Sequence, residues 1–291
     1  MATELRYRVV DVFTEQALEG NALAVFTDAS ALDLLTMQRI ARELNLAETA
    51  FILPPTRSDC AARVRIFTPA KEMRFAGHPT IGTAYVIVEE GKVAAQQFSL
   101  QEEIGPVPVR VERGARPRLW LSTPVIEEGP TYDPGQCAAV LGLERADLLE
   151  ITPQRLNGGN PTIFVPLKDR AAVDRAWLDL AGMRQLRGKD PELACVFVFT
   201  TTPEGAYSRM FAPEYGIAED PATGSATGPL AAFMMRHGLI SRSGGTRFVS
   251  EQGTKMGRRS LLHVQVNGEE GSQSIEIGGH VTPLIEARMW L

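Results

Sequence analysis

The sequence predicts an α+β protein made of two similar domains. Its 291 residues exceed the usual size of one compact domain. Both halves mix short strands with an apolar helix, and three features recur in the same order about half a chain apart. These features are Gly20–Ala22 and Gly159–Pro161, Arg65–Pro69 and Arg209–Pro213, and His78–Ala84 and Asp220–Ala226. A repeat of this kind indicates a duplicated domain.

The first half carries the clearest secondary-structure signals. Apolar residues at three-to-four spacing predict a helix that ends near Leu44 and is capped by Ser30. A second helix over Gly77–Val88 opens with Pro79 in its first turn. It has almost no polar face, so we expect it to be buried on nearly all sides. Runs of β-branched and aromatic residues predict strands at Arg8–Phe13, Ala22–Phe26, Ala50–Leu53, Ala62–Phe67, Gln97–Leu100, Val107–Val111 and Leu119–Ser122.

The stretch Thr123–Pro134 is rich in proline and is the best candidate for a linker. It places one domain at residues 1–124 and the other at residues 125–291, with the final strand near 282–291 able to return to the first domain. Two similar domains often hold a small molecule between them. We therefore expect a cleft that both halves form, with His78 and Asp220 facing each other across it.

Composition excludes several classes of function. The net charge of −5 is spread along the chain, without the basic cluster that a nucleic acid requires. The N-terminal residues carry charges where a signal peptide has its apolar core, and no apolar run reaches the roughly 20 residues of a membrane span. We expect a cytoplasmic protein that binds neither nucleic acid nor membrane.

Metal, thiol and nucleotide chemistry are not expected either. The histidines lack the spacing of a metal site, and neither a dinucleotide fingerprint nor a phosphate-binding loop is present. Cys60, Cys137 and Cys195 form no paired motif, and we interpret them as reduced packing residues, although any of them could be a reactive thiol. The predicted site therefore contains no metal and no cofactor.

His78 and Asp220 are the residues most suited to chemistry in the repeated motif. Each precedes a proline at the expected start of a helix, where either could simply be a capping residue. Their matched positions favour a proton-transfer site with one such group from each half. Helix starts expose backbone N–H groups, so Gly77, Gly224 and Ser225 could hold a carboxylate, or could instead be small residues that permit close packing. These features predict a substrate that is a small carboxylic acid.

Glu48 lies between the first helix and the next strand, among the apolar residues Leu46, Ala47, Ala50 and Phe51. Most glutamates at such junctions are solvated or cap a helix. A carboxyl group in apolar surroundings, however, has a raised pKa, which suits a general acid or base near neutral pH.

The sequence resembles the PhzF-like (phenazine biosynthesis) isomerase family over nearly its whole length. The segments that carry the resemblance are Leu18–Asn21, Met37–Glu48, Arg65–Pro69, Phe75–Pro79, Ser208–Phe211, Glu219–Ala226 and Glu251–Gly253. The Gly-His-Pro and Asp-x-Ala-Thr-Gly-Ser motifs, at this separation, are specific to the family. Ala47 stands where phenazine-forming members often carry Ser, so the resemblance indicates the family more firmly than the substrate.

The resemblance implies a diaminopimelate-epimerase-like fold with two pseudo-symmetric domains, each a curled β-sheet around a central helix. It also implies a cofactor-free isomerase similar to trans-2,3-dihydro-3-hydroxyanthranilate isomerase, and we expect a homodimer. Two alternatives are a cofactor-free epimerase of an amino-acid-like substrate and a binding protein without turnover. The family's catalytic residues fall on Glu48, His78 and Asp220, and the predicted substrate-binding residues are Asn21, Gly77, Gly224 and Ser225.

Overall fold

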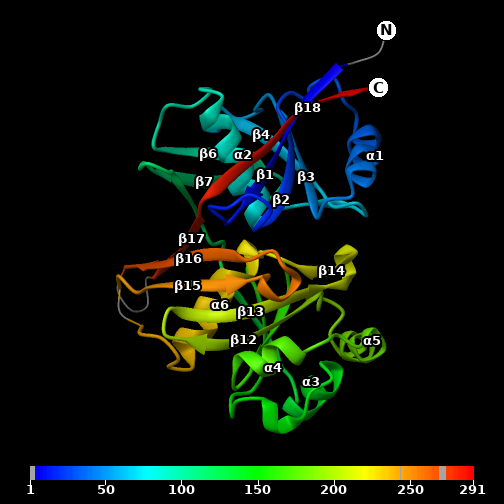
Figure 1. The fold of residues 1–291 in the computed structure, drawn as a ribbon, viewed down its shortest axis with the longest axis vertical. Coiled ribbons are helices and arrows are strands. Elements are labelled where there is room, and N and C mark those ends of the chain that lie inside the picture. The colour runs from blue at the N-terminus through cyan, green and yellow to red at the C-terminus, as the bar shows by residue number, and fades with distance from the viewer. Residues whose placement is uncertain (1–3, 243, 269–272) are drawn as a thin grey trace. The chain divides into compact units, whose positions relative to one another are not determined.

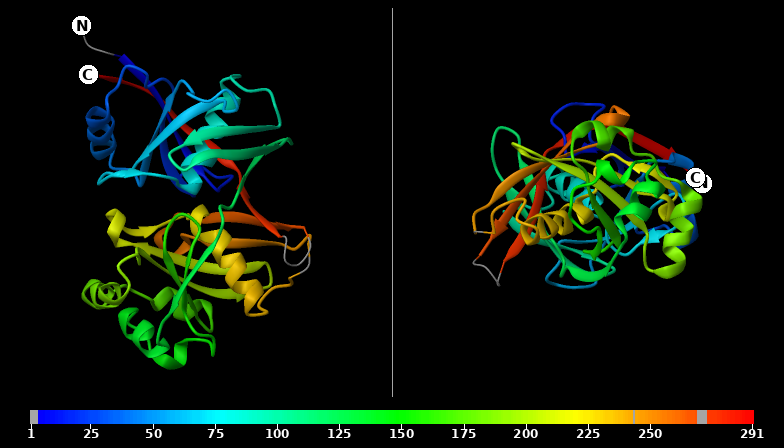
Figure 2. Two further views of the ribbon diagram at one scale, coloured as in Figure 1. Left: turned by 180° about the vertical axis from the view of Figure 1, so that it is seen from behind. Right: turned by 90° about the horizontal axis from the view of Figure 1, so that it is seen from below.

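The structure, a computed structural model, describes residues 4–242, 244–268 and 273–291. The chain divides into two compact units (Figures 1 and 2). Unit 1 contains Met1–Ser122 and Ile277–Leu291, and unit 2 contains Thr123–Glu276. Each unit is a mixed, mainly antiparallel set of strands with a long apolar helix, which is the predicted α+β class.

Unit 1 begins with the predicted hairpin. β1 (Glu4–Val12) pairs antiparallel with β2 (Asn21–Phe26), and β2 pairs parallel with β3 (Glu48–Leu53). The pairing continues from β3 to β4 and from β4, in parallel, to β6. The last strand, β18, returns to pair antiparallel with β1. The remaining strands of the unit are β4 (Ala62–Phe67), β5 (Glu72–Met73), β6 (Gln97–Glu102), β7 (Gly105–Glu112), β8 (Arg118–Ser122) and β18 (Val281–Trp290).

The second unit takes in all the chain from Thr123 to Glu276, so it ends before the C-terminus and not at residue 291. The predicted linker Thr123–Pro134 is largely ordered structure, because β9 (Glu127–Thr131) pairs with β10 and α3 starts at Pro134. Proline rules out the interior of a sheet, but it is compatible with the first turn of a helix and with a strand at an edge. The chain crosses between the units at residues 122–123 and returns at residues 276–277, within β17 (Ser274–Gly279).

The helix α2 (Gly77–Glu89) is the centre of unit 1. Its residues from Gly77 to Ile87 are all buried, as its lack of a polar face predicts (Figure 1). Gly82 is needed for this packing, because a Cβ there would lie 2.6 Å from a Leu23 methyl carbon and 2.9 Å from one of Val12. The helix therefore lies directly against β1 and β2.

The helix α1 (Leu34–Leu44) covers unit 1 with an apolar stripe that includes Met37, Ile40 and Ala41. Ser30 is not its cap, contrary to the prediction. Asp33 caps it, because its carboxylate accepts a hydrogen bond from the Thr36 N–H at 2.8 Å. Residues from α1 pack with Phe26, Phe51 and other residues in one apolar cluster.

Unit 2 repeats the pairing pattern of unit 1. Here β11 pairs parallel with β12, and β13 pairs parallel with β15, as β2 with β3 and β4 with β6 do in unit 1. The long helix α6 (Gly224–Arg236) corresponds to α2 and is buried along most of its length. The further elements are α3 (Pro134–Val140), β10 (Gln154–Asn157), β11 (Thr162–Pro166), α4 (Arg170–Arg175), α5 (Leu180–Lys189), β12 (Cys195–Thr202), β13 (Gly205–Ala212), β14 (Ile217–Asp220), β15 (Arg247–Gln252), β16 (Ser260–Asn267) and β17 (Ser274–Gly279).

A matched ion pair supports the duplication. Arg65 of β4 makes two hydrogen bonds to Glu72, and Arg209 of β13 makes two to Glu219. Each guanidinium also lies over the phenylalanine two residues further along its own strand, at 5.0–5.5 Å from the ring centre. The repeated Arg-x-Phe pattern thus folds into the same arrangement twice, which confirms the two-fold repeat.

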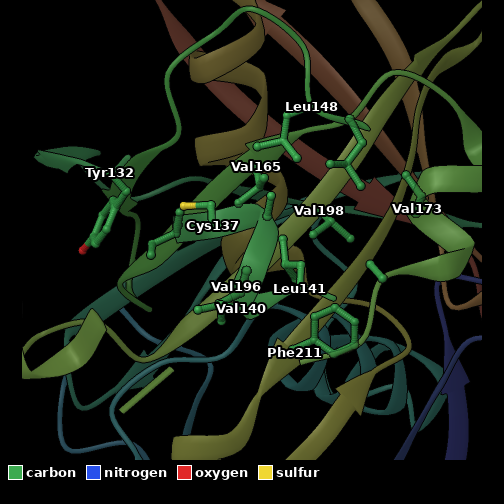
Figure 3. Close-up of a cluster of buried hydrophobic side chains, with 14 of the residues drawn as sticks. Tyr132, Cys137, Val140, Leu141, Leu148, Val165, Val173, Val196, Val198 and Phe211 are labelled. Carbon is green, nitrogen blue, oxygen red and sulfur yellow. The ribbon is translucent and has the colours of Figure 1, made fainter. Parts of the chain in front are cut away.

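The three cysteines are buried, and none of them forms a disulfide. Cys137 lies in the apolar cluster of unit 2 with Leu141, Val165 and Val196 (Figure 3). Burial raises the pKa of its thiol to about 12, so the thiolate form is disfavoured. Its role in packing is as predicted. Among the residues that the structure describes, no helix is long and apolar enough to cross a membrane.

Candidate active site

Glu48 is the first residue of β3, and the end of α1 directs it into unit 1. The helix stops at Leu44 because Asn45 takes a left-handed conformation, with φ of 50°, and its N–H bonds the carbonyl of Ala41. The chain then enters β3, where Glu48 stands opposite Leu23 of β2. Only 7% of Glu48 is exposed. A carboxyl group is therefore held inside the unit, at the edge of its apolar core.

His78 is the second residue of α2 and is 3% exposed. Its Nε2 lies 3.3 Å from Oε2 of Glu48, and its Nδ1 lies 3.1 Å from the amide nitrogen of Asn21. Burial lowers the pKa of His78 to about 3. The imidazole is therefore neutral at physiological pH, and its contact with Glu48 joins a carboxyl group to a neutral ring.

The position of the His78 proton follows from its two neighbours. The amide nitrogen of Asn21 is a donor, so Nδ1 of His78 accepts. In a neutral imidazole the other nitrogen then carries the hydrogen, which places an N–H at Nε2 beside the Glu48 carboxyl group. Asn21, His78 and Glu48 thus form a row of buried polar side chains, with the imidazole next to the carboxyl group.

The first turn of α2 has no side-chain cap. Its N-cap residue is Ala76, which offers no acceptor, and its third residue, Pro79, has no N–H. The N–H groups of Gly77 and His78 therefore receive no bond from the N-cap side chain. Free N–H groups and the positive end of the helix dipole suit the binding of an anion, such as a carboxylate.

The corresponding turn in unit 2 is built differently. Asp220 is buried at the end of β14 and accepts a hydrogen bond from the Thr223 hydroxyl. Thr223 is the N-cap of α6, and its side chain makes no capping hydrogen bond. Gly224 and Ser225 are the first two residues of α6, and the Ser225 hydroxyl oxygen lies 2.8 Å from the amide nitrogen of Asn160. This turn also presents backbone N–H groups without a side-chain cap.

The predicted equivalence of His78 and Asp220 as N-caps is wrong. The N-caps are Ala76 and Thr223, so His78 corresponds to Ser225 and not to Asp220. The amides of the two matched asparagines agree with this, since one contacts His78 and the other contacts Ser225. The repeated sequence pattern pairs Pro79 with Pro221. In the structure Pro79 lies inside α2 whereas Pro221 precedes α6, so the two prolines are not equivalent.

The structure thus brings the predicted residues together in two groups. Asn21, Glu48, Gly77 and His78 belong to unit 1, while Gly224, Ser225 and Asp220 belong to unit 2.

Other buried polar residues also support these groups. Asn160 and Gln252 lie in the motifs Gly159–Pro161 and Glu251–Gly253, and these motifs are the signals that could have identified them. Glu102 gave no signal, because it sits in a polar stretch that is typical of an exposed strand end. Its burial is visible only in the folded chain, where it is 5% exposed.

A search of the described residues finds no group of three or more His, Cys, Asp or Glu side chains that could hold a metal ion. The side chains at the two helix starts are donors and acceptors of protons and hydrogen bonds. The groups of each unit are suited to binding an acid, and the Glu48 carboxyl group of unit 1 is suited to carrying a proton.

Comparisons with known proteins agree with this architecture. The chain is 36% identical to the trans-2,3-dihydro-3-hydroxyanthranilate isomerase of Pseudomonas aeruginosa, over 98% of this chain and 99% of that protein. A solved structure from Pseudomonas aeruginosa, described as a predicted epimerase, is 35% identical with a TM-score of 0.85 and covers 98% of this chain and 99% of that one. A hydroxyproline epimerase from Agrobacterium vitis shares the fold, with a TM-score of 0.66, 15% identity and coverage of 99% and 93%.

The family model described as phenazine biosynthesis-like protein matches residues 10–287. This match covers nearly the whole chain, and the relatives above include a named isomerase at 36% identity. The fold, with two similar units that are each built around a buried helix, is the one that the resemblance implied. The chain therefore belongs to the phenazine biosynthesis-like (PhzF) family and is an isomerase of that type.

Proposed function

We propose that the enzyme moves a proton between two carbons of a small unsaturated amino or hydroxy acid, without a cofactor, and that Glu48 carries the proton. The observation that supports this most is the buried row of Asn21, His78 and Glu48. A carboxyl group that is shielded from water and lies beside a neutral imidazole suits proton transfer to and from carbon.

The proposed reaction has two steps. The Glu48 carboxylate takes a proton from an activated carbon, and the electrons of the C–H bond enter the conjugated system of the substrate. Glu48, now neutral, returns the proton to another carbon of the same system, and the carboxylate is regenerated. The atoms and electrons balance without any oxidant or reductant.

The binding roles rest on the two helix starts. The N–H groups of Gly77 and His78 would hold a substrate carboxylate, and those of Gly224 and Ser225 would hold a second polar group. Asp220 would accept a hydrogen bond from an amine or hydroxyl of the substrate. The duplicated sequence predicts that the two groups of residues act on one bound molecule, and this stays a prediction. The homodimer and the cytoplasmic location also stay predictions.

The most direct test uses trans-2,3-dihydro-3-hydroxyanthranilate, the substrate in the name of the relative from Pseudomonas aeruginosa. The enzyme is incubated with it in D₂O, and the product is analysed by NMR. We expect the double bonds to shift and deuterium to enter at the carbon that receives the proton, to the extent that Glu48 exchanges with solvent. A substrate that returns unchanged and without deuterium, at enzyme concentrations that bind it, would remove this substrate from the proposal.

A cofactor-free epimerase is the second candidate, because the solved structure at 35% identity is described as a predicted epimerase. The two reactions give different products in the same experiment. An epimerase inverts one carbon and places deuterium there, while its double bonds keep their positions. A panel of cyclic and acyclic amino and hydroxy acids, first screened by thermal stabilisation, extends the test to other substrates.

A further inference from the structure

Glu102 is a buried acid that the proposed mechanism does not use. It is the last residue of β6, and its Oε1 lies 2.6 Å from the Thr80 hydroxyl of α2. Its other oxygen, Oε2, is buried and has no hydrogen-bond partner among the described residues. Burial raises the pKa of Glu102 to about 8. The side chain is therefore a neutral carboxylic acid at pH 7, next to the first turn of the helix that carries His78.

The two contacts of the Thr80 hydroxyl also require Glu102 to be protonated. The hydroxyl oxygen of Thr80 lies 2.7 Å from the carbonyl oxygen of Ala76 and 2.6 Å from Glu102. A hydroxyl has one hydrogen, and a carbonyl can only accept. When Thr80 donates to Ala76, the short contact with Glu102 needs a hydrogen from the acid. A protonated Glu102 supplies it, and both contacts are then hydrogen bonds.

Unit 2 has a glutamine at the corresponding place. Strand β6 pairs parallel with β4 as β15 pairs with β13, and the matched arginines Arg65 and Arg209 set the register. In that register Glu102 corresponds to Gln252, which stands opposite Ser208. The equivalent helix starts are thus supported from the same position on the sheet, once by an acid and once by an amide.

Gln252 shows what this position does. Its amide nitrogen donates to the Asp220 carbonyl at 2.7 Å and to the Thr223 hydroxyl at 3.0 Å, and its oxygen accepts from the Thr223 N–H at 3.1 Å. Gln252 therefore holds the N-cap of α6 by donating as well as accepting. A carboxylate cannot donate, whereas a carboxylic acid can, as an amide does.

We propose that Glu102 is a positioning residue, which as a neutral acid donates to Thr80 and holds the first turn of α2, and with it Gly77 and His78, in the geometry for proton transfer. The relevance to catalysis rests on the proposed function. An ionised Glu102 could only accept from Thr80. The Thr80 hydroxyl would then turn from Ala76 to Glu102, and the Ala76 carbonyl would lose one of its two hydrogen bonds from Thr80, keeping the one from the backbone N–H.

No neighbouring charged side chain causes the raised pKa of Glu102. Its pKa is raised by burial and lowered by the Thr80 bond, without a contribution from a neighbouring charge. Its exposed neighbour Glu103 pairs with Arg74 at 3.3 Å. The other ionisable residues on the elements packed around it are Glu48 of β3, Arg63 and Arg65 of β4, Glu72 of β5, His78, Tyr85 and Glu89 of α2, and Arg110 and Glu112 of β7.

The first test compares Glu102→Gln, Glu102→Leu and the surface control Glu103→Gln by NMR without substrate. In the wild type, the amide signals of Gly77 and His78 should shift with a midpoint near pH 8. The shift should disappear in Glu102→Gln, which keeps a donor for Thr80 but cannot ionise, and should persist in Glu103→Gln. A wild type without this titration, or one that persists in Glu102→Gln, would overturn the proposal whatever the substrate is.

Thermal unfolding gives a second measurement that is independent of activity. An acid whose pKa rises from about 4.5 unfolded to about 8 folded stabilises the protein most below pH 4.5, and this stabilisation is lost as the pH rises to 8. The Tm of the wild type should therefore fall relative to Glu102→Gln by about 3 °C per pH unit between pH 5 and 8. If the Tm values of the wild type and of Glu102→Gln change with pH in the same way, this result would contradict a protonated Glu102.

Kinetics then test the positioning role. Glu102→Gln should retain kcat within about 2-fold at pH 7 and should lack the fall in activity that we expect for the wild type near pH 8. Glu102→Leu should lose about 5- to 10-fold in kcat with little change in KM, the effect of one hydrogen bond on the transition state. A folded Glu102→Leu variant with wild-type kcat would show that Glu102 positions nothing that the reaction needs.

Discussion

The first turns of α2 and α6 can be compared residue by residue. Each helix has 13 residues, begins with glycine and has an N-cap that does not cap it through its side chain. The second residue contacts the amide of a matched asparagine in both, but it is His78 in α2 and Ser225 in α6. The two first turns have the same backbone arrangement, whereas the side chains that could carry a proton differ between them.

The difference extends to the acids beside each helix start. Glu48 lies on a strand that follows another helix, and it contacts His78. Asp220 lies on the strand that leads into α6, and the Thr223 hydroxyl bonds it. The Glu48 carboxyl group therefore lies beside a neutral imidazole, whereas the Asp220 carboxyl group is engaged by a hydroxyl donor. We therefore expect chemistry from unit 1 and binding from unit 2.

The largest expected effect separates the two acids. Glu48→Gln keeps the shape of the side chain but cannot carry a proton, so kcat should fall about 10²- to 10⁴-fold. Asp220→Asn should mainly raise KM, because its expected role is to bind. Steady-state kinetics with Tm measurements on both variants check this. If Glu48 only supports its helix-to-strand junction, Glu48→Gln will instead have a lower Tm and nearly normal kcat.

The two asparagines provide a smaller and matched comparison. Asn21→Ala removes the donor that sets the His78 ring, so we expect kcat to fall about 5- to 10-fold. Asn160→Ala removes the donor to Ser225, so we expect KM to rise by a similar factor. Both variants should be measured at saturating and at limiting substrate. Equal effects of the two substitutions on kcat would contradict the division of roles between the units.

His78 should also make the stability of unit 1 depend on pH. Ser225 does not ionise in this range, so it cannot do the same for unit 2. Because burial lowers the pKa of His78 to about 3, the unfolded chain binds a proton below about pH 6.5 while the folded chain does not. Stability from this group is present above pH 6.5 and is lost as the pH falls, by about 1.4 kcal/mol per pH unit. Urea unfolding of wild type and His78→Gln at pH 7 and pH 5 measures it. The wild type should lose about 2 kcal/mol more than the variant over this range.

The smallest effect is expected from metal and thiol removal, since neither helix start contains a cysteine. Activity should survive EDTA and should stay within about 2-fold in a variant with all three cysteines changed to alanine, although that variant should be less stable because the thiols are buried. Turnover is measured for each sample, and circular dichroism shows whether the protein in that sample remains folded. Loss of turnover in EDTA, by a protein that remains folded, would contradict proton transfer by side chains alone.

Much of this molecule could be read from the sequence. The repeated Arg-x-Phe and Gly-Asn patterns predicted the duplication, because identical local patterns fold into identical strand ends. The apolar stretch after Gly77 predicted a buried helix, because a helix without a polar face must be covered on all sides. The expected candidates lie side by side, with Nε2 of His78 3.3 Å from Oε2 of Glu48.

Other features were decided only by the tertiary structure. The sequence pattern matched His78 with Asp220, but the helix starts match His78 with Ser225, since a proline can stand inside a first turn or before it. The burial of Glu102 is set by β6, β4 and α2 together, which surround it only in the folded chain. Periodicity along one strand reports which face a residue is on, but the protonation state of an acid depends on what covers that face.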